Sequence, residues 1–394
     1  MNLRFADRYE GVTGSAIRAI FSLLADPEII SFAGGNPAPD SFPKEKMAQL
    51  AYELTKENGD AVLQYGGTSG TNDLLNEIKK SLEEEGFKPQ MNELITLTGS
   101  SQGIDFMGKA FINPGDVILV ESPTFLGAIQ TFKLHQAKIV EVEMDEKGIV
   151  MDDLEQKLKD YSPKFIYTIP TFQNPTGRTL PADRRKKMEE LCREYDCVIL
   201  EDDPYGKLRY RGEAQPSIKS FDKEGDDSIV VRLISYSKTI SPGVRVGAAY
   251  ANPAIIQKFV LAKQGADVHS PNLTQNMVAG YLAEGCLPAG IQHNCDLYKD
   301  KLALMCDLAE KYFPEGTKLV RPEGGMFIWL ELPENINATE MFSEAVKRKV
   351  AYVPGTHFYA DGGHDNTLRL NFTMVSEDKI KKGMKILGDM FCGR

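Results

Sequence analysis

Residues 229–250 read IVVRLISYSKTISPGVRVGAAY, and this stretch decides the fold class. Its two ends, 229–235 and 244–250, are rich in β-branched and apolar residues, which favours strands. The middle holds serine, proline and glycine, residues typical of turns. We therefore predict two strands joined by a polar turn that presents Lys238.

The side chains of this turn suit a carbonyl-reactive amine beside an anion site. An amine must be partly neutral to attack an aldehyde, and desolvation and nearby cations lower its pKa. Arg245 lies seven residues after Lys238 and can bind a phosphate with two donors, while Ser235 and Ser237 add hydroxyl groups. Taken alone, the turn fits an ordinary surface lysine about as well, because short motifs match by chance.

Acidic residues follow another apolar run, VIL at 198–200. Residues 201–205 read EDDPY and include Asp202 and Tyr205. In open α/β folds, ligands bind at the carboxyl ends of the strands. A carboxylate placed there can hold a proton on a ring nitrogen of a ligand. A solvated acidic loop is the alternative interpretation of this segment by itself.

Two more polar turns follow predicted strands. Residues 172–177 read FQNPTG, and the Asn-Pro pair with its following glycine predicts a turn that carries Asn174. Residues 98–103 read TGSSQG and offer Ser100, Ser101 and Gln102 at a predicted helix start, where backbone N–H groups favour an anion. Neither segment is a dinucleotide or P-loop motif.

The four turns share one predicted sheet. Apolar runs at 94–98, 117–120, 138–143 and 165–169 alternate with helical patterns such as 181–195, and nearly continuous apolar strands indicate a mostly parallel sheet covered on both faces. A helix before the sheet is expected to be capped by Thr71 and ended by Gly86, with one apolar stripe. That stripe consists of Leu74, Leu75, Ile78 and Leu82.

The pattern changes after residue 252. Long helices at 253–265, 271–285 and 288–312 precede three predicted strands, at 318–320, 326–332 and 368–374, which alternate with helices at 338–348 and 376–391. This order is typical of a second, smaller α+β domain. We predict an N-terminal arm at 1–45 with an amphipathic helix at 16–25, a large domain at 46–289 and a small domain at 290–394.

Composition excludes several classes of function. The chain has 394 residues and a net charge of −10, so we expect no nucleic-acid partner and no anionic membrane surface. Its six cysteines are scattered and its five histidines have no metal-ligand spacing, so we expect reduced thiols and no metal. The N-terminus has no secretory pattern and no window is a membrane span, so the expected location is cytoplasmic.

In this order, GSSQG, NPTG, EDDPYG and SYSKTISPGVR resemble the fold-type I, class I/II aminotransferases, which depend on pyridoxal 5′-phosphate (PLP). The resemblance extends to GGMFIWLEL at 324–332 and LRLNF at 368–372, so it covers nearly the whole chain. It implies a large domain with a mostly parallel sheet, a smaller α+β domain and an active homodimer with composite sites.

The resemblance also implies roles for individual residues. Lys238 is expected to hold PLP as a Schiff base and, once released, to act as the acid/base. Asp202 is expected at the pyridine nitrogen, and Tyr205 and Asn174 at the phenolic oxygen. The remaining implied cofactor contacts are Phe125 on the ring, and Ser100, Ser101, Gln102, Ser235, Ser237, Arg245 and the partner-directed Tyr65 at the phosphate.

Implied substrate contacts are Arg369 at the α-carboxylate, together with Asn174, Gly35 and Arg18. The segments SAIR at 15–18 and SFAGGNPAPDSFP at 31–43 resemble the branch of 2-aminoadipate, aromatic and branched-chain aminotransferases. They also resemble the aminotransferase domain of regulators that carry a winged helix. The sequence departs from the aminotransferase branch at Ser101, where that branch often has glutamine. Arg18 is the expected partner of a distal substrate carboxylate.

The expected reaction is ping-pong transfer of an amino group between an α-amino acid and a 2-oxo acid, with 2-oxoglutarate and glutamate as one pair. A PLP-dependent β-eliminating lyase or a decarboxylase shares the same Lys238 chemistry and stays open. A non-catalytic regulator with this fold also stays open, although the full set of Lys238, Asp202, Asn174 and Arg369 disfavours it. A nicotinamide dehydrogenase is disfavoured, because no GxGxxG motif opens the predicted sheet of this sequence.

Overall fold

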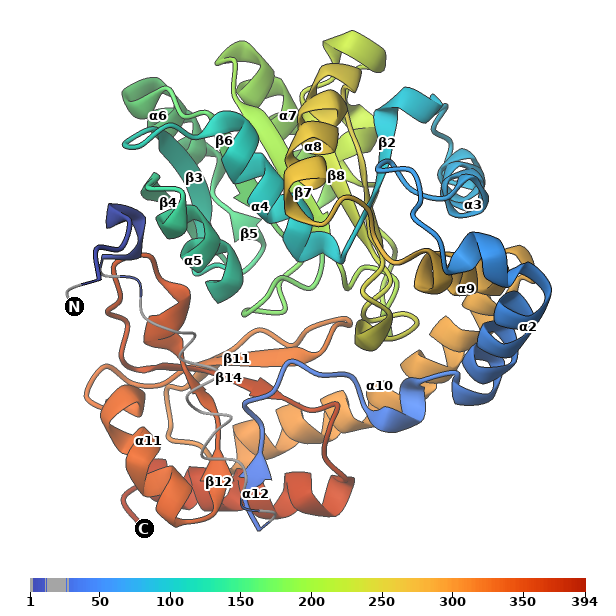
Figure 1. Ribbon diagram of the computed structural model, residues 1–394. Coiled ribbons are helices and arrows are strands. Elements are labelled where there is room, and N and C mark those ends of the chain that lie inside the picture. Colours follow the sequence, from blue (N-terminus) through green and yellow to red (C-terminus); the bar gives the residue numbers. More distant parts are fainter. Residues whose placement is uncertain (1–2, 11, 13–25, 27) are drawn as a thin grey trace.

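The computed structural model describes residues 3–10, 12, 26 and 28–394. The helix predicted at 16–25, and with it Arg18, lies outside the described residues. Figure 1 shows a large sheet with helices on both faces above a smaller sheet packed on helices. No helix of the described ranges is long and apolar enough to cross a membrane.

Eight strands form the large sheet in the order β2-β9-β8-β7-β6-β3-β4-β5. The five strands from β8 to β4 are parallel, and the pairs β2–β9, β9–β8 and β4–β5 are antiparallel. The predicted, mostly parallel sheet is thus confirmed. The strands are β2 (Leu94–Leu97), β3 (Val117–Ser122), β4 (Lys138–Asp145), β5 (Gly148–Ile149), β6 (Phe165–Thr168), β7 (Val198–Asp203), β8 (Val230–Ser235) and β9 (Gly247–Tyr250).

The two faces of this sheet are buried in different apolar cores, because side chains alternate along each strand. In β3, Ile118 and Val120 join one core while Leu119 joins the other. The first face is covered by α4 (Ser100–Phe111), α5 (Leu126–Leu134) and α8 (Pro253–Ala266), and the second by α6 (Met151–Tyr161) and α7 (Ala182–Glu194). Burial on both faces explains the nearly continuous apolar runs.

A third core lies beyond the β2–β9 edge, where three helices pack: α2 (Lys44–Val62), α3 (Asn72–Glu84) and α9 (Asn272–Ala283). The predicted apolar stripe of α3 is buried there as expected. Thr71 occupies the N-cap position of α3, but the prediction that its hydroxyl caps the helix is wrong. That hydroxyl has no hydrogen-bond partner among the described residues, and it is the backbone N–H of Thr71 that is bound, to the Gln275 side chain of α9 at 3.1 Å.

The smaller sheet is antiparallel, in the order β10-β11-β14-β13, and packs on helices α10 and α12. Along β14, Leu368 and Leu370 join this core, so Arg369 between them points to the opposite face. The elements are α10 (Cys286–Tyr312), β10 (Lys318–Leu319), β11 (Phe327–Glu331), α11 (Ala338–Lys347), β13 (Val353–Pro354), β14 (Thr367–Asn371) and α12 (Glu377–Phe391).

Residues 30–36 run alongside the smaller sheet. Strand β1 (Ile30–Ser31) pairs in parallel with β12 (Val350–Ala351), and Phe32 is fully buried in the core of the smaller sheet. The domain limits at 45 and 289 stay a prediction, and the second of them falls in the first turns of the continuous helix α10.

Short 3-10 helices complete the described chain. They are η1 (Asp7–Tyr9), η2 (Pro39–Ser41), η3 (Met91–Glu93), η4 (Ile218–Phe221), η5 (Gly225–Asp227), η6 (Pro242–Val244) and η7 (Gly355–Phe358). The strand predicted from residue 244 begins only at Gly247, because η6 and the left-handed Arg245 (φ 52°) intervene.

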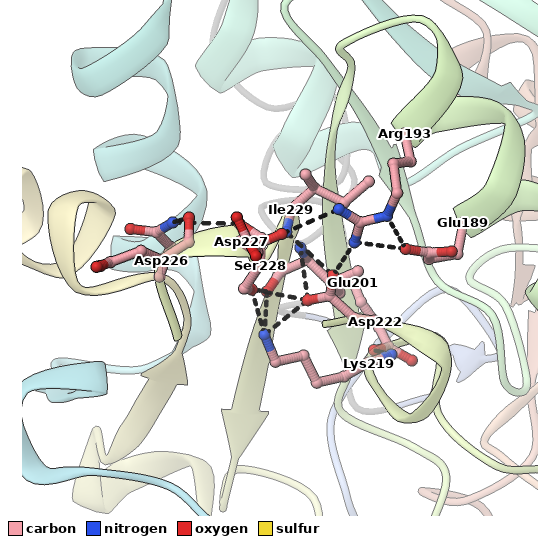
Figure 2. A network of polar contacts seen from close by, with 11 residues as sticks. Glu189, Arg193, Glu201, Lys219, Asp222, Asp226, Asp227, Ser228 and Ile229 are labelled. Atoms are coloured by element: carbon pink, nitrogen blue, oxygen red, sulfur yellow. Dashed lines mark hydrogen bonds and ion pairs between the residues drawn. The ribbon is translucent and has the colours of Figure 1, made fainter. Parts of the chain in front are cut away.

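The loop after β7 is fixed to the sheet by a buried polar network (Figure 2). The Lys219 ammonium donates to Asp222 at 2.8 Å, to the Ser228 hydroxyl at 2.5 Å and to the carbonyl of Val230 at 3.1 Å. Arg193 of α7 pairs with the same Asp222 at 2.7 Å. Because each buried charge has a partner, this network holds the 217–230 loop in place at the start of β8.

Candidate active site

A cavity of about 280 Å³ lies at the carboxyl ends of the central parallel strands, between the two sheets. Parallel strands bring the turns that follow them to one edge, which explains why residues distant in sequence meet here. The lining residues that the sequence predicted are Gly35, Ser100, Ser101, Phe125, Asn174, Asp202, Tyr205, Ser235, Ser237, Lys238, Arg245 and Arg369. Asn36, Ile169, Pro204, Pro242 and Phe327 complete the lining.

Lys238 extends from the turn after β8 into this cavity. Its ammonium donates a hydrogen bond to the carbonyl oxygen of Gly35 at 2.8 Å. Burial lowers the pKa of Lys238 to about 8, with smaller contributions from the positive charges of Arg369 and Arg245. A substantial share of this amine is therefore neutral near physiological pH, as an amine that attacks an aldehyde requires.

Asp202 presents a carboxylate with one unused acceptor. Its Oδ2 atom accepts a hydrogen bond from the Tyr167 hydroxyl at 2.9 Å, whereas Oδ1 is buried and has no partner among the described residues. Burial raises the pKa of Asp202 to about 7, although the Tyr167 hydrogen bond opposes the shift. A buried carboxylate oxygen without a donor is costly, so the site calls for an N–H or a cation at this point.

Asn174 lies in the opposite wall of the cavity, between Tyr205 and Arg369. Its Nδ2 atom lies 3.5 Å from the Tyr205 hydroxyl, and its Oδ1 accepts a hydrogen bond from Nη1 of Arg369 at 2.8 Å. Nη2 of Arg369 donates to the carbonyl of Ala33 at 3.0 Å. The Arg369 guanidinium also lies 4.2 Å from the ring centre of Phe327, and burial lowers its pKa to about 10.

Hydroxyls and a guanidinium gather at the other end of the cavity. Helix α4 starts at Ser100, so its first N–H groups, with Ser101, face the end where Arg245 lies. Arg245 adopts a left-handed backbone and its Nη2 donates to the carbonyl of Thr98 at 3.1 Å. Gly99 beside it has φ 79°, a backbone conformation that other residues adopt only with strain, and a side chain there would displace the guanidinium. This end of the cavity is built to bind an anion.

The side chain of Gln102 does not line the cavity. Its Oε1 accepts hydrogen bonds from the backbone of Thr98 at 2.9 Å and from the fully buried ammonium of Lys263 at 2.7 Å, and its Nε2 donates to Asp267 at 2.8 Å. Lys263 also donates to Ser270 at 3.0 Å. Gln102 therefore supports the turn from behind, in a network that the sequence did not reveal.

Tyr65 also lies away from the cavity of its own chain. Its side chain is 82% exposed and meets the His269 ring edge to face, with centroids 5.9 Å apart.

Gly35 and Phe125 both line the cavity, and Phe125 directly precedes α5.

Two buried residues that support the site, Tyr167 and Glu121, belong to none of the motifs found in the sequence. Tyr167, which holds Asp202, lies inside the apolar run FIYT, and its phenol is a polar group in a strand buried on both faces. Glu121 near the end of VILVES is a charge in another such strand. A polar or charged group inside a nearly continuous apolar strand is the signal that identifies them, because its burial requires a partner.

These groups fit PLP. The partly neutral amine of Lys238 suits its aldehyde, the free Oδ1 of Asp202 suits its protonated pyridine nitrogen, and the hydroxyl and guanidinium end suits its phosphate. The flat ring of Phe125 lines the cavity between them. The fold and the site together define a PLP-dependent enzyme.

Comparison with known proteins gives the family. The family model described as "Aminotransferase class I and II" matches residues 27–387. The chain therefore belongs to the class I and II aminotransferases. It is 40% identical over 391 residues to aromatic-amino-acid aminotransferase 1 of Thermococcus litoralis, covering 98% of this chain and 93% of that protein. It is likewise 40% identical to 2-aminoadipate transaminase of Thermus thermophilus, with 96% and 94% covered.

Solved structures agree. The crystal structure of Pyrococcus horikoshii kynurenine aminotransferase, in complex with PMP, has a TM-score of 0.94 at 39% identity and covers 99% of this chain and 97% of that chain. The crystal structure of LysN, the α-aminoadipate aminotransferase of Thermus thermophilus, contains N-(5′-phosphopyridoxyl)-L-leucine. Its TM-score is 0.90 at 37% identity, with 99% and 97% covered. The protein is thus a PLP-dependent aminotransferase.

The lowered pKa of Lys238 predicts how capture of the cofactor depends on pH. The folded amine loses its proton near pH 8 instead of near 10.5, so covalent attachment of added PLP to the cofactor-free protein should speed up with a midpoint near pH 8. Stopped-flow absorbance from pH 6.5 to 10 measures this rate. A midpoint above pH 10 would show that the amine is not perturbed.

The lowered pKa of Lys238 also makes the stability of the cofactor-free protein depend on pH. The unfolded lysine binds its proton more tightly than the folded one, so the penalty is complete below pH 8 and disappears as the pH rises toward 10.5. Lys238→Met should therefore stabilise the cofactor-free protein at pH 7 by about 2–3 kcal/mol, and by much less at pH 10. Urea unfolding at the two pH values gives the comparison.

Asp202 and Asp203 form a matched pair of carboxylates. Asp202→Asn removes the charge at the pyridine end of the cavity, so turnover should fall by about a hundredfold or more while the fold persists. Asp203→Asn should have a mild effect, because that carboxylate accepts the Gly206 N–H at 2.8 Å and does not line the cavity. Steady-state kinetics decide, and equal losses in both variants would reject the assignment of Asp202.

Proposed function

We propose that the protein transfers an amino group between an α-amino acid and a 2-oxo acid in two half-reactions, with glutamate and 2-oxoglutarate as one pair. The observation that carries this proposal is the placement of Arg369 and Lys238 on one cavity that also holds an anion-binding end. Bound PLP supplies a ring that accepts electrons from the substrate. The cavity orients an amino acid by its α-carboxylate, with its α-carbon beside the lysine.

The residues of this chain divide the work. Lys238, once its amine is free, moves the proton at the substrate α-carbon, because among the described residues it is the lysine that lines the cavity. Asp202 keeps a proton on the ring nitrogen, and Asn174 and Tyr205 donate to the phenolic oxygen. Phe125 packs on the ring. The phosphate contacts are Ser100, Ser101, Ser235, Ser237 and Arg245, with Gln102 fixing their turn.

Arg369 binds the α-carboxylate of every substrate. Its two Nη atoms bond Asn174 and Ala33, while its Nε has no partner in the part of the chain that the structure describes. The rings of Phe327 and Phe358 lie 4.2 and 4.9 Å from the guanidinium. The rings fix the plane of the fork, so a carboxylate meets two donors in a defined orientation. Asn174 is placed to contact the same carboxylate.

The substrates that we propose are aromatic and 2-aminoadipate-like amino acids, as in the relatives named above. Among the described residues, the cations that line the cavity are Lys238, Arg245 and Arg369, and each has one of the roles above. A distal carboxylate of glutamate or 2-aminoadipate therefore needs another partner. We assign it to Arg18, which lies outside the described residues, and we place Gly35 beside the substrate.

We also propose that the active unit is a homodimer. Tyr65 is exposed and faces away from its own cavity, as expected of a side chain that reaches the phosphate of a partner subunit. Leu63, Leu261 and Val268 are further large apolar residues that are exposed on this chain. Analytical ultracentrifugation tests the proposal, and a fully active monomer would contradict it.

A panel of amino donors with 2-oxoglutarate tests the function. The wild type should form glutamate and the matching 2-oxo acid, whereas a β-eliminating lyase would release ammonia and pyruvate instead. Arg369→Lys keeps the charge but loses the two-pronged fork, so kcat/KM should fall about ten- to a hundredfold for all donors alike. A loss confined to acidic donors would show that Arg369 binds the distal carboxylate instead.

A further inference from the structure

Glu121 is a buried carboxylate that the proposed reaction does not use. It is the penultimate residue of β3, it is 2% exposed, and it does not line the cofactor cavity. Along β3 it points to the same face as Leu119, the face covered by α6 and α7, away from Asp202. A buried charge at such a position requires partners that hold it.

The partners of Glu121 all come from one segment, the end of β6 and the turn that follows it. The Thr168 hydroxyl donates at 2.6 Å, the Ile169 N–H lies 3.2 Å from both carboxylate oxygens, and Nε2 of Gln173 donates at 2.9 Å. Burial raises the pKa of Glu121 to about 7, and these hydrogen bonds oppose that rise. The carboxylate thus binds the Thr168–Gln173 segment to the end of β3.

Gln173 organises the turn that carries Asn174. Its Oε1 atom accepts from the N–H of Thr176 at 2.9 Å and from the Thr176 hydroxyl at 2.7 Å, and its backbone N–H donates to the carbonyl of Arg178 at 2.9 Å. All of these bonds lie within the turn, whereas the Nε2 bonds of Gln173, to Glu121 and to the carbonyl of Pro123, leave it. Glu121 therefore helps to hold the turn of Asn174 against the sheet, in addition to the direct bond between Asn174 and Arg369.

The same bonds fix the segment that carries Phe125. Nε2 of Gln173 also donates to the carbonyl of Pro123 at 2.7 Å, two residues before Phe125. The next residue, Thr124, donates its N–H to the carbonyl of Phe358 at 2.8 Å, and the Phe358 ring packs on Arg369. The Gln173 amide, which Glu121 holds, therefore connects the turn of Asn174 with the segment that carries Phe125.

We propose that Glu121 is a positioning residue that fixes the Asn174 turn and the Phe125 segment relative to each other, and so sets the affinity of the cavity for PLP. This inference rests on the proposed roles of Asn174 and Phe125 in holding the cofactor. It does not depend on which amino acid is the substrate.

Glu201 provides a matched control. It lies on β7, it is fully buried on the same face of the sheet, and it accepts hydrogen bonds from the backbone of Ile218 at 2.8 Å and of Lys219 at 3.0 Å. Figure 2 shows it within the network that fixes the 217–230 loop, and neither its partners nor Glu201 itself line the cavity. Glu201→Gln therefore disturbs a comparable carboxylate without touching the cavity walls.

The experiment compares Glu121→Gln, Glu201→Gln and the wild type. In Glu121→Gln an amide NH₂ replaces one carboxylate oxygen. This NH₂ group is a donor that faces the N–H of Ile169 or of Gln173, so a buried donor is left without an acceptor. Titration of each cofactor-free protein with PLP, followed by absorbance, gives the dissociation constant. We expect an increase of about tenfold or more for Glu121→Gln and less than twofold for Glu201→Gln, with similar falls in Tm.

Equal dissociation constants in the two variants would overturn the proposal, because Glu121 would then serve stability alone. If Glu121→Gln does not fold, Gln173→Met carries the test, since it removes the connection and leaves Glu121 its bonds to Thr168 and Ile169. A wild-type dissociation constant in Gln173→Met would overturn the proposal as well. A protein that binds PLP but does not transfer amino groups would reject the proposed function and leave this comparison valid.

Discussion

The site depends on the burial of opposite charges around one cavity. Lys238 and Asp202 both lose solvation there, and burial moves their pKa values toward each other, to about 8 and about 7. The hydrogen bonds of Lys238 and Asp202 go to the Gly35 carbonyl and the Tyr167 hydroxyl, so no ion pair between the two relieves either shift among the described residues. A ligand that brings an aldehyde to the amine and an N–H to the carboxylate relieves both costs, and PLP has both groups.

The sheet makes this arrangement possible. Because side chains alternate along each strand, Asp202 faces the cavity while its neighbours Glu201 and Asp203 face away. The same alternation on β14 turns Arg369 to the cavity and its neighbours Leu368 and Leu370 to the core of the smaller sheet. The apolar cores on both sides keep the two sheets in place, so charged groups meet at fixed distances and cost little reorganisation during the reaction.

Much of this architecture follows from the sequence because it depends on local signals. Nearly continuous apolar runs predicted the parallel strands, and polar turns at their ends predicted which residues meet in the cavity. Hydrogen bonds between distant segments were harder to predict. The side chain of Gln102 turns to Lys263, 161 residues away, and Thr71 bonds to Gln275 of α9 through its N–H without capping α3 through its hydroxyl. Glu121 accepts a hydrogen bond from Gln173, 52 residues away, and no sequence motif predicts that contact.

The central claim is that the amine of Lys238 is the group that binds PLP covalently. Reduction of the purified, PLP-loaded protein with borohydride fixes the cofactor to its lysine, and mass spectrometry of a proteolytic digest then locates the added pyridoxyl group. We expect one modified peptide, with the label on Lys238, and no label in Lys238→Ala treated in the same way. A pyridoxyl group on any other lysine, or stoichiometric labelling of Lys238→Ala, would contradict the account.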